Sequence, residues 1–387
     1  MNMVSLGETA KNIIYGLTQS ATHSKVGPKF LRITDIQDET VNWKDVPYCK
    51  CTKNEIDKYS LNPGDILFAR SGATTGKTFL VKRLPEKSVF ASYLIKIQLN
   101  ENIANSYFVS YFLKSTLYWK QIKDNSVGAT LPNVNGTKLK SIHIPLPPLD
   151  EQKRIASLLE RADKLRSMRK FAIAQTETYL QSLFIEMFDK ADKNLEPISN
   201  FCEINPINNK ILKVSDNNEV SFIPMNSISE NGNIIVYEKR KYKDVKKGFT
   251  SFKEGDVLFA KITPCMENGK GVIARNLINQ IGFGSTEFHV LRPIKNISTS
   301  EWLFYLTKQK SFRKHAEKNM TGSAGQRRVP ASFFDRFITF CPPLELQNRF
   351  AEQVEKIERI KLQQQEALRQ AEHLFQGMLH RAFNGEL

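Results

Sequence analysis

The stretch ARSGATTGKTFLV, residues 69–81, combines residue types that can hold a phosphate group, because a Gly-rich turn precedes Gly-Lys-Thr. In a nucleotide-binding loop, a glycine stands five places before the glycine of the Gly-Lys-Ser/Thr triplet, and a helix follows the loop. Here the place five before Gly76 is Ser71, and Gly72 comes one place late. The Thr-Phe-Leu-Val that ends the stretch is β-like rather than helical. The stretch therefore does not meet the requirements of a nucleotide site.

A β-hairpin with a basic residue at each shoulder, Arg70 and Lys77, is the better interpretation of this stretch. A second stretch about 190 residues later, AKITPCMENGKG, has Lys261 and Lys270 at the corresponding places. Its loop differs in length and composition. Constant flanks around a variable loop suit a frame that presents two different polar loops to a phosphate-bearing partner. A plain structural hairpin is the alternative.

Residue patterns of catalysis and metal binding are missing. The chain has no Asn/Asp-Pro-Pro-Tyr/Phe segment of the kind that amino-methyltransferases use, and its histidines form no HxxxH or HxH pair. Asp65 and Asp256 are not followed by a Glu-x-Lys of a nuclease, so we expect them to shape the turn before a strand. Cys49 and Cys51 form a CxC without a second ligand pair. We expect no catalytic residue, no metal and no cofactor.

The elements that must position the two hairpins belong to an internal repeat. Four stretches recur in the same order, with offsets of 191 to 195 residues. The matched stretches are 30–36 with 222–228, 63–70 with 254–261, 76–77 with 269–270, and 147–152 with 342–347. The chain is therefore two diverged copies of one unit of about 190 residues.

Each copy consists of a strand-rich globule followed by a long helix. The globules, residues 1–147 and 190–342, contain short β-type runs between Gly, Asn and Pro turns. The helices, residues 148–189 and 343–387, carry apolar residues at alternating steps of four and three, which is the coiled-coil repeat. The predicted interface residues are Ile155, Leu159, Ala162, Ile173, Leu180, Leu183, Phe350, Val354, Ile357, Leu368, Phe375 and Met378.

Connectivity sets the expected arrangement of the two helices. If the two apolar stripes pair, they must run antiparallel, because each helix leaves its own globule and ends near the other one. Forty helical residues make a rod of about 60 Å. The sequence thus predicts an α+β fold with two globules at opposite ends of an antiparallel two-helix coiled coil, related by a pseudo-twofold axis. Two amphipathic helices packed on separate cores are the alternative.

The charge of the chain is concentrated in the globules. The formal net charge is +16, whereas residues 150–188 hold seven basic and six acidic residues, and residues 344–387 hold six and seven. Two basic globules on a neutral rod suggest a clamp on a polyanion, although lysine-rich loops can also be merely solvated. Without a run of eighteen apolar residues, no membrane span is expected. Five scattered cysteines favour a reducing cytoplasm.

The order of these parts resembles a known family over essentially the whole chain. Three segments show the resemblance: IPLPPLDEQKRIASLLERADKL after the first globule, FCPPLELQNRFAEQVEKIERI after the second, and the terminal AFNGEL. A Gly-Asp-hydrophobic-Leu-Phe-Ala-Arg/Lys segment in each globule adds to the match. The chain is similar to the specificity (S) subunit of Type I restriction–modification enzymes. Cys341 for Leu146 and Leu346 for Glu151 are mild departures between the copies.

The resemblance implies a non-catalytic subunit with two target-recognition domains, 1–147 and 190–342, that read the two halves of an asymmetric bipartite site in double-stranded DNA. The helical spacer would dock two modification (methyltransferase) subunits, and restriction subunits would join through them. The candidate DNA-binding residues are Arg70, Ser71, Thr74, Thr75, Lys77, Lys261, Thr263, Asn268, Lys270, Arg327 and Arg328. A self-contained methyltransferase or nuclease, and a coiled-coil scaffold or RNA-binding protein, are the alternative functions.

Overall fold

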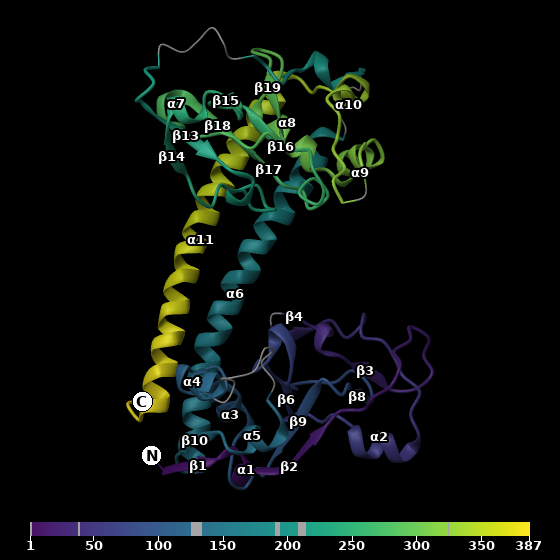
Figure 1. The fold of residues 1–387 in the computed structure, drawn as a ribbon, viewed down its shortest axis with the longest axis vertical. Coiled ribbons are helices and arrows are strands. Elements are labelled where there is room, and N and C mark those ends of the chain that lie inside the picture. The colour runs from purple at the N-terminus through teal and green to yellow at the C-terminus, as the bar shows by residue number, and fades with distance from the viewer. Residues whose placement is uncertain (1, 38, 125–133, 190–193, 208–213, 324) are drawn as a thin grey trace. The chain divides into compact units, whose positions relative to one another are not determined.

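A computed structural model describes residues 2–37, 39–124, 134–189, 194–207, 214–323 and 325–387. The chain divides into two compact units. Unit 1 comprises Met1–Lys170 and Glu366–Leu387, and unit 2 comprises Phe171–Gln365. Each unit thus contains one globule, part of the helix that follows it, and part of the other long helix (Figure 1).

The centre of unit 1 is a four-stranded antiparallel sheet in the order β2-β9-β6-β7. These strands are Ala10–Tyr15, Leu94–Leu99, Ile66–Ala69 and Thr78–Leu80. Three strand pairs flank it: β1 (Asn2–Ser5) with β10 (His143–Leu146), β3 (Lys29–Leu31) in parallel with β8 (Ser88–Phe90), and β4 (Ile36–Gln37) with β5 (Thr40–Val41). The helical segments are α1 (Leu6–Thr9), η1 (Ile33–Asp35), α2 (Lys53–Tyr59), η2 (Gly72–Thr74), α3 (Ser106–Phe112), α4 (Thr116–Asp124) and α5 (Gly136–Lys140).

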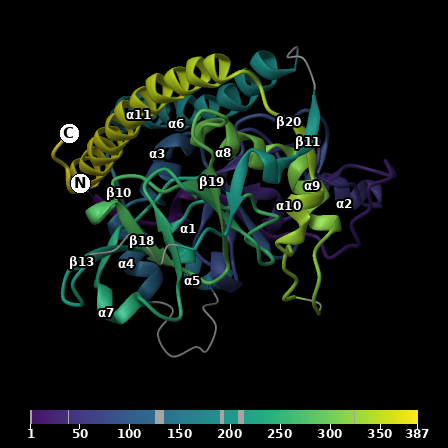
Figure 2. The same ribbon diagram turned by 90° about the horizontal axis from the view of Figure 1, so that it is seen from above.

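Unit 2 repeats this plan with strand order β12-β19-β16-β17. These strands are Cys202–Ile204, Phe288–Pro293, Val257–Ala260 and Gly271–Ile273. The parallel pair is β13 (Glu219–Ile223) with β18 (Ile281–Gly284), extended here by the edge strands β14 (Glu238–Lys241) and β15 (Thr250–Lys253). Strands β11 (Leu195–Pro197) and β20 (Ile338–Phe340) lie side by side (Figure 2). The helical segments are η3 (Ile198–Asn200), η4 (Met225–Ser227), α7 (Tyr242–Val245), η5 (Ile278–Gln280), α8 (Ser300–Lys308), α9 (Lys310–Lys318) and α10 (Ser332–Arg336).

The matching strand orders, each with a parallel pair at the same place in the chain, confirm the internal repeat and the α+β class. The predicted hairpins are also present, since β6 pairs with β7 and β16 pairs with β17, both antiparallel.

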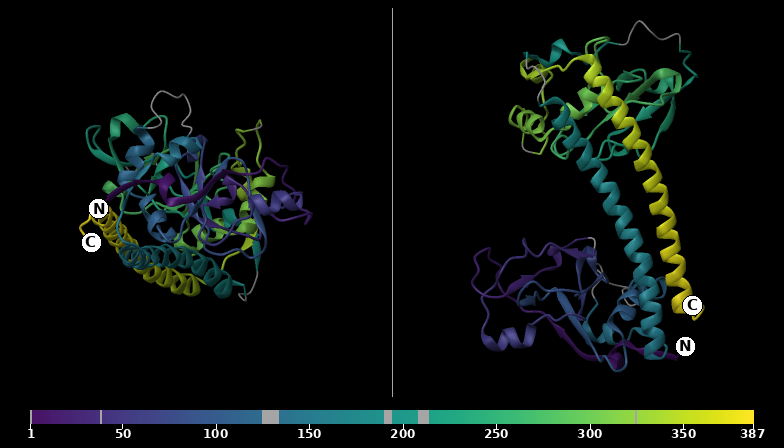
Figure 3. Two further views of the ribbon diagram at one scale, coloured as in Figure 1. Left: turned by 90° about the horizontal axis from the view of Figure 1, so that it is seen from below. Right: turned by 180° about the vertical axis from the view of Figure 1, so that it is seen from behind.

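The two long helices are α6 (Leu149–Phe188) and α11 (Leu344–Asn384), visible in Figures 1 and 3. Within unit 1, Lys170 pairs with Glu372 at 3.2 Å across the helices. Within unit 2, the rings of Phe184 and Phe350 lie 5.5 Å apart. Residue numbers rise along one helix as they fall along the other, so the pairing is antiparallel.

The apolar stripes of the helices are shared with the globules. In unit 1, Ile155 and Leu159 are fully buried in one core with Phe375 and with Phe108 and Phe112 of α3. In unit 2, Leu180, Phe350, Val354 and Ile357 join the aromatic core around Trp302, with Leu183 partly buried. The helices therefore bury their stripes against each other and against the globules at once.

Burial of the stripe is not uniform along the helices. Ile173 and Leu368 are only partly buried, and the charged Arg166 and Lys361 occupy stripe positions. Lys361, 2% exposed, contacts Glu177 at 2.6 Å and Glu358 at 3.5 Å. Arg166 contacts Asp163 at 2.7 Å, and its guanidinium lies 4.5 Å from the ring centre of Phe375. Both the buried Lys361 and the half-buried Arg166 therefore have an acidic partner, as burial of a charge requires.

Candidate nucleic-acid interface

The loop of the β6–β7 hairpin in unit 1 is a tight, self-bonded turn. Thr75 donates from its amide and its hydroxyl to the carbonyl of Gly72, at 3.1 and 2.7 Å. The amide of Gly76 donates to Ala69, which closes the loop against the strand. Gly76 has a φ of 89°, a left-handed conformation that favours glycine. These bonds within the loop shape the turn.

The predicted residues of this loop differ in what they present to solvent. Lys77 is exposed, and Arg70, Ser71 and Thr74 are half-buried. Thr75 is buried, with 9% of its surface exposed. The structure corrects the prediction for Thr75. Its hydroxyl donates to the backbone of the loop and stabilises the turn, so it is not part of the exposed surface.

Arg70 stands at the base of the loop against an aromatic ring. Its guanidinium lies 4.9 Å from the ring centre of Tyr15, within the range of a cation–π contact. The hydroxyl of Tyr15 accepts from the amide of Gly136, and the amide of Arg70 donates to the carbonyl of Tyr93. Tyr93 is 64% exposed. Sequence reasoning missed both tyrosines, because only the fold brings residues 15 and 93 to the loop.

The corresponding loop of unit 2, between β16 and β17, is longer and forms a helical turn. The amides of Met266 and Asn268 donate to the carbonyls four residues earlier, each at 3.0 Å. Asn268 is exposed and donates from its side chain to Glu230. Lys270 is half-buried, and its ammonium group lies 3.4 Å from the carbonyl of Met225.

Unit 2 brings together predicted residues that are far apart in the chain. The amide of Thr263 donates to the carbonyl of Arg327, and the amide of Val329 donates to the carbonyl of Lys261. An isolated bridge joins Ile262 to Arg328. The segment with the two arginines therefore runs beside the first half of the hairpin loop. In unit 1, the amide of Val134 donates to the carbonyl of Arg70 in the same way.

Two carboxylates partly neutralise this basic surface. Arg328 makes a bidentate contact with Glu287, at 2.8 Å for the shortest pair, and this contact holds the pKa of Glu287 below its usual value. Arg327 lies 3.5 Å from Glu267, which also accepts from the hydroxyl of Thr263. Glu287 takes the place in unit 2 that Tyr93 has in unit 1, since its carbonyl accepts from the amide of Lys261.

A buried histidine supports the two-arginine segment from beneath. The ring of His289 is 5% exposed, with Nε2 at 2.8 Å from the carbonyl of Val329 and Nδ1 at 3.0 Å from the side-chain nitrogen of Asn205. Nδ1 also lies 3.3 Å from the side-chain oxygen of Asn205. A neutral ring that donates from Nε2 to Val329 and accepts at Nδ1 fits the two shorter contacts. Burial lowers the pKa of His289, which favours the same neutral form.

Asp65 and Asp256 have the structural role that the sequence predicts. Each carboxylate accepts from the amide three residues earlier, at 2.8 Å from Asn62 and 2.7 Å from Lys253, and so closes the turn before β6 or β16. Burial raises the pKa of Asp65, an effect that the Asn62 amide and a nearby lysine oppose.

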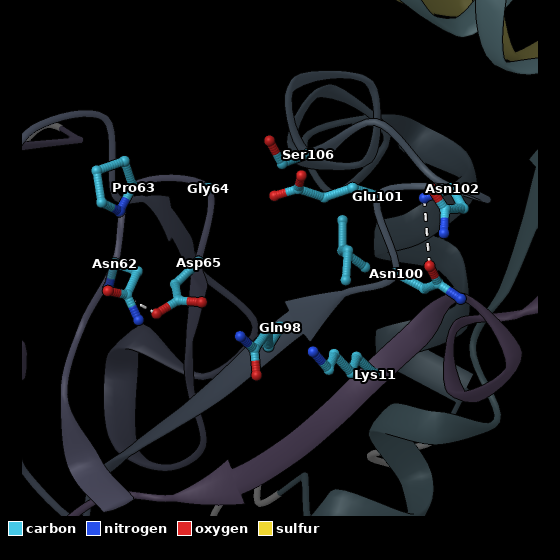
Figure 4. Close-up of a pocket in the computed structure, with 11 residues that line it drawn as sticks. Lys11, Asn62, Pro63, Gly64, Asp65, Gln98, Asn100, Glu101, Asn102 and Ser106 are labelled. Atoms are coloured by element: carbon cyan, nitrogen blue, oxygen red, sulfur yellow. Dashed lines mark hydrogen bonds between the residues drawn. The ribbon is translucent and has the colours of Figure 1, made fainter. Parts of the chain in front are cut away.

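The buried aspartates are neutralised from different places. In unit 1, Lys96 of β9 lies 3.6 Å from Asp65. In unit 2, Arg292 of β19 forms two bonds to Asp256, at 2.8 and 2.7 Å. The strand registers make Gln98, not Lys96, the counterpart of Arg292. In unit 1, Asp65 and Gln98 line a pocket of about 400 Å³, as Figure 4 shows. In unit 2, Arg292 stands at the position of Gln98 and bonds to Asp256, which stands at the position of Asp65.

Comparisons with known proteins agree with this architecture. The family described as "Type I restriction modification DNA specificity domain" matches residues 17–175 and 192–372, once in each half of the repeat. The chain belongs to this family. Its two DNA specificity domains explain why one hairpin frame occurs twice with different loops.

Relatives of the chain within this family are specificity subunits. The EcoAI specificity subunit of Escherichia coli is 46% identical over 153 residues, which are 39% of this chain and 26% of that subunit. The StySPI specificity subunit of Salmonella potsdam is 24% identical over 92% of this chain and 82% of its own length. The matches span about a quarter of the EcoAI subunit and 34% of the EcoEI subunit of Escherichia coli.

A solved structure shares the fold over the full chain. It comes from work on complex assembly and conformational transition of the type I R-M system, and it covers 100% of this chain and 98% of its own, with a TM-score of 0.55 and 19% identity. Within the described residues, no helix is long and apolar enough to cross a membrane.

Proposed function

We propose that this chain is the sequence-specificity subunit of a Type I restriction–modification complex, with each unit reading one half of an asymmetric bipartite site in double-stranded DNA. The observation that carries the proposal is one hairpin frame presented twice with different side chains. Unit 1 offers a short loop flanked by Tyr15 and Tyr93. Unit 2 offers a helical turn flanked by Arg328 and Glu287. Unlike readers on like frames fit two unlike half-sites.

In this proposal, the lysines and arginines of the loops and of the neighbouring segment position the duplex, and the polar loop residues read it. Lys77, Lys270 and Arg327 would contact phosphates, which carry most of the affinity and little sequence information. Side chains such as Thr74 and Asn268 would meet base edges, since an amide side chain can pair with adenine in the major groove. A cytoplasmic location follows from access to the DNA.

The helix pair would set the distance between half-sites and dock two modification subunits, which would in turn bring the restriction subunits. Helix α6 has 40 residues and is therefore about 60 Å long. It also exposes large apolar side chains: Met168 is 59%, Phe171 66% and Tyr179 56% exposed. At 3.6 residues per turn, these three lie within about a quarter of the helix circumference. Such a stripe suits a protein partner better than water.

The test is the methylation pattern of DNA in cells that express the full chain with the modification subunit of its own system. We expect modified bases in a single bipartite, asymmetric sequence with a fixed spacer. Exchanging residues 71–76 for the loop of a relative should change one half of that sequence and leave the other half and the spacer unchanged. Methylation with no bipartite dependence would refute the proposal.

A further inference from the structure

A buried side chain on a short helix forms a hydrogen bond to each of the two hairpin loops. The helix is α4 in unit 1 and α9 in unit 2, the second short helix after the sheet in each case. Both side chains donate to the carbonyl of the glycine that precedes the loop's final lysine, Lys77 or Lys270. These glycines, Gly76 and Gly269, correspond in the repeat, and both have positive φ, at 89° and 79°. A hydrogen bond from this helix to the loop glycine is therefore common to both units, although the donating groups differ.

In unit 1 the fastening group is a phenol. Tyr118 is fully buried, and its hydroxyl donates to the carbonyl of Gly76 at 2.5 Å. Its ring packs edge-on against Phe112 and Trp119, which fix its orientation. A side chain at Gly76 would collide with Trp119, so the loop and the helix are in direct contact.

In unit 2 the fastening group is a guanidinium. Arg313 is 8% exposed and donates to the carbonyls of Met266 at 3.0 Å, Gly269 at 3.3 Å and Lys270 at 3.4 Å. Its Nε donates to Thr307, which ties the group to the end of α8. These loop carbonyls end the helical turn of residues 262–270, where partial negative charge gathers and a cation is favourable.

The position of Arg313 rules out a direct contact with DNA. Its guanidinium faces inward, 4.4 Å from the ring centre of Phe259 in β16. The planar group reaches several carbonyls at once, which a lysine ammonium on a flexible stem does less well. The same carbonyls also accept from the amides of Gly269 and Ala260 and from the Lys308 ammonium. Removing the guanidinium would therefore break the bonds that join the turn to α9 and hold it less tightly in one conformation.

We propose that Tyr118 and Arg313 are positioning residues for sequence reading, each holding the loop of its own unit in the conformation that meets the bases. This inference rests on the proposed function. A loop that samples several conformations discriminates poorly between bases, because bidentate contacts depend on fixed geometry. Each side chain should therefore control the specificity of one half-site alone.

The experiment compares three variants of the full chain, each purified with the modification subunit of its system: Arg313→Lys, Arg313→Met and Tyr118→Phe. Methylation rates are measured on the cognate duplex and on duplexes with single-base changes in either half-site. We expect both Arg313 variants to lower discrimination about tenfold or more at one half-site, with Met the more severe. Tyr118→Phe should lower it at the other half-site, by a smaller factor because one bond is lost.

Thermal unfolding of each variant separates positioning from a purely structural role. A lowered unfolding temperature with unchanged discrimination at both half-sites would overturn the inference, as would equal losses at both half-sites. If the Arg313 variants fail to fold, Tyr118→Phe still decides the matter, because its ring and packing are kept. If the unmodified chain methylates without a bipartite site, the proposed function itself fails, which is a different result.

Discussion

The glutamine three residues into each long helix makes a sharp stability prediction. Gln152 and Gln347 are both fully buried. The carbonyl oxygen of Gln347 accepts from the amide of Thr299 at 2.8 Å, and its nitrogen donates to the carbonyls of Ile297 at 2.9 Å and Pro342 at 2.7 Å. Gln152 makes the same three bonds in unit 1, to Asn105, Ile103 and Pro147.

Replacing Gln347 by leucine keeps the volume and removes all three bonds. The lost bond to Pro342 leaves a buried carbonyl unpaired, at about 1–3 kcal/mol, and the two part-buried bonds contribute about 0.5–1.5 kcal/mol each. The extra apolar area that leucine buries offsets about 1 kcal/mol. We expect Gln347→Leu to lower the free energy of unfolding of unit 2 by about 1–5 kcal/mol, and Gln152→Leu to do the same to unit 1.

The assay is urea unfolding followed by far-ultraviolet circular dichroism, with the shift in each transition midpoint multiplied by its slope. Because the chain has two units, the curve can show two transitions, and each variant should move one of them. Gln353→Leu is the matched control, since Gln353 is exposed on the same helix as Gln347. A loss below about 1 kcal/mol in both variants would refute the reasoning that these amides fasten globule to helix.

Three further predictions concern charge. Lys361→Met should destabilise unit 2 by about 1.5–3 kcal/mol because it leaves the half-buried carboxylate of Glu177 without its cation. The double variant with Glu177→Met should recover most of that loss in a double-mutant cycle. Burial holds the pKa of His289 below its unfolded value of 6.5, so its contribution to stability should be lost as the pH falls below 6.5. In thermal melts, His289→Asn should reduce this loss, whereas the control His373→Asn, at an exposed position, should not. Lys77→Ala should weaken binding to cognate and unrelated duplexes equally, and should reduce the slope of log affinity against log salt by about 1 in fluorescence titrations; a sequence-dependent effect would contradict a phosphate contact.

The repeat, the long helices and the hairpins could be predicted because their signals are local or periodic. A Gly-Asp turn, a run of β-branched residues and a heptad stripe each depend on neighbours in the chain. The matching of two copies strengthened each of these local signals. Asp65 and Asp256 are examples, since the turn that each one closes spans only three residues.

Strand order and the surroundings of the loops depend on contacts between distant residues, which a single sequence does not reveal. Tyr118 reaches Gly76 across 42 positions and Arg313 reaches Gly269 across 44. The heptad pattern treats Lys361 as an interruption, whereas in the structure it is buried and paired with the half-buried Glu177. Thr75 was misjudged because a threonine in a polar loop gives no sign of which way its hydroxyl turns.

The different cations beside the two buried aspartates restrict how such units can be recombined. A hybrid strand made from the first half of β9 and the second half of β19, joined between positions 96 and 98, would contain both Lys96 and Arg292. The reverse hybrid would contain neither cation. The first hybrid crowds two cations around one carboxylate, and the second leaves that carboxylate buried alone. New specificities should therefore be assembled by exchanging loops or entire units, with junctions kept out of this strand.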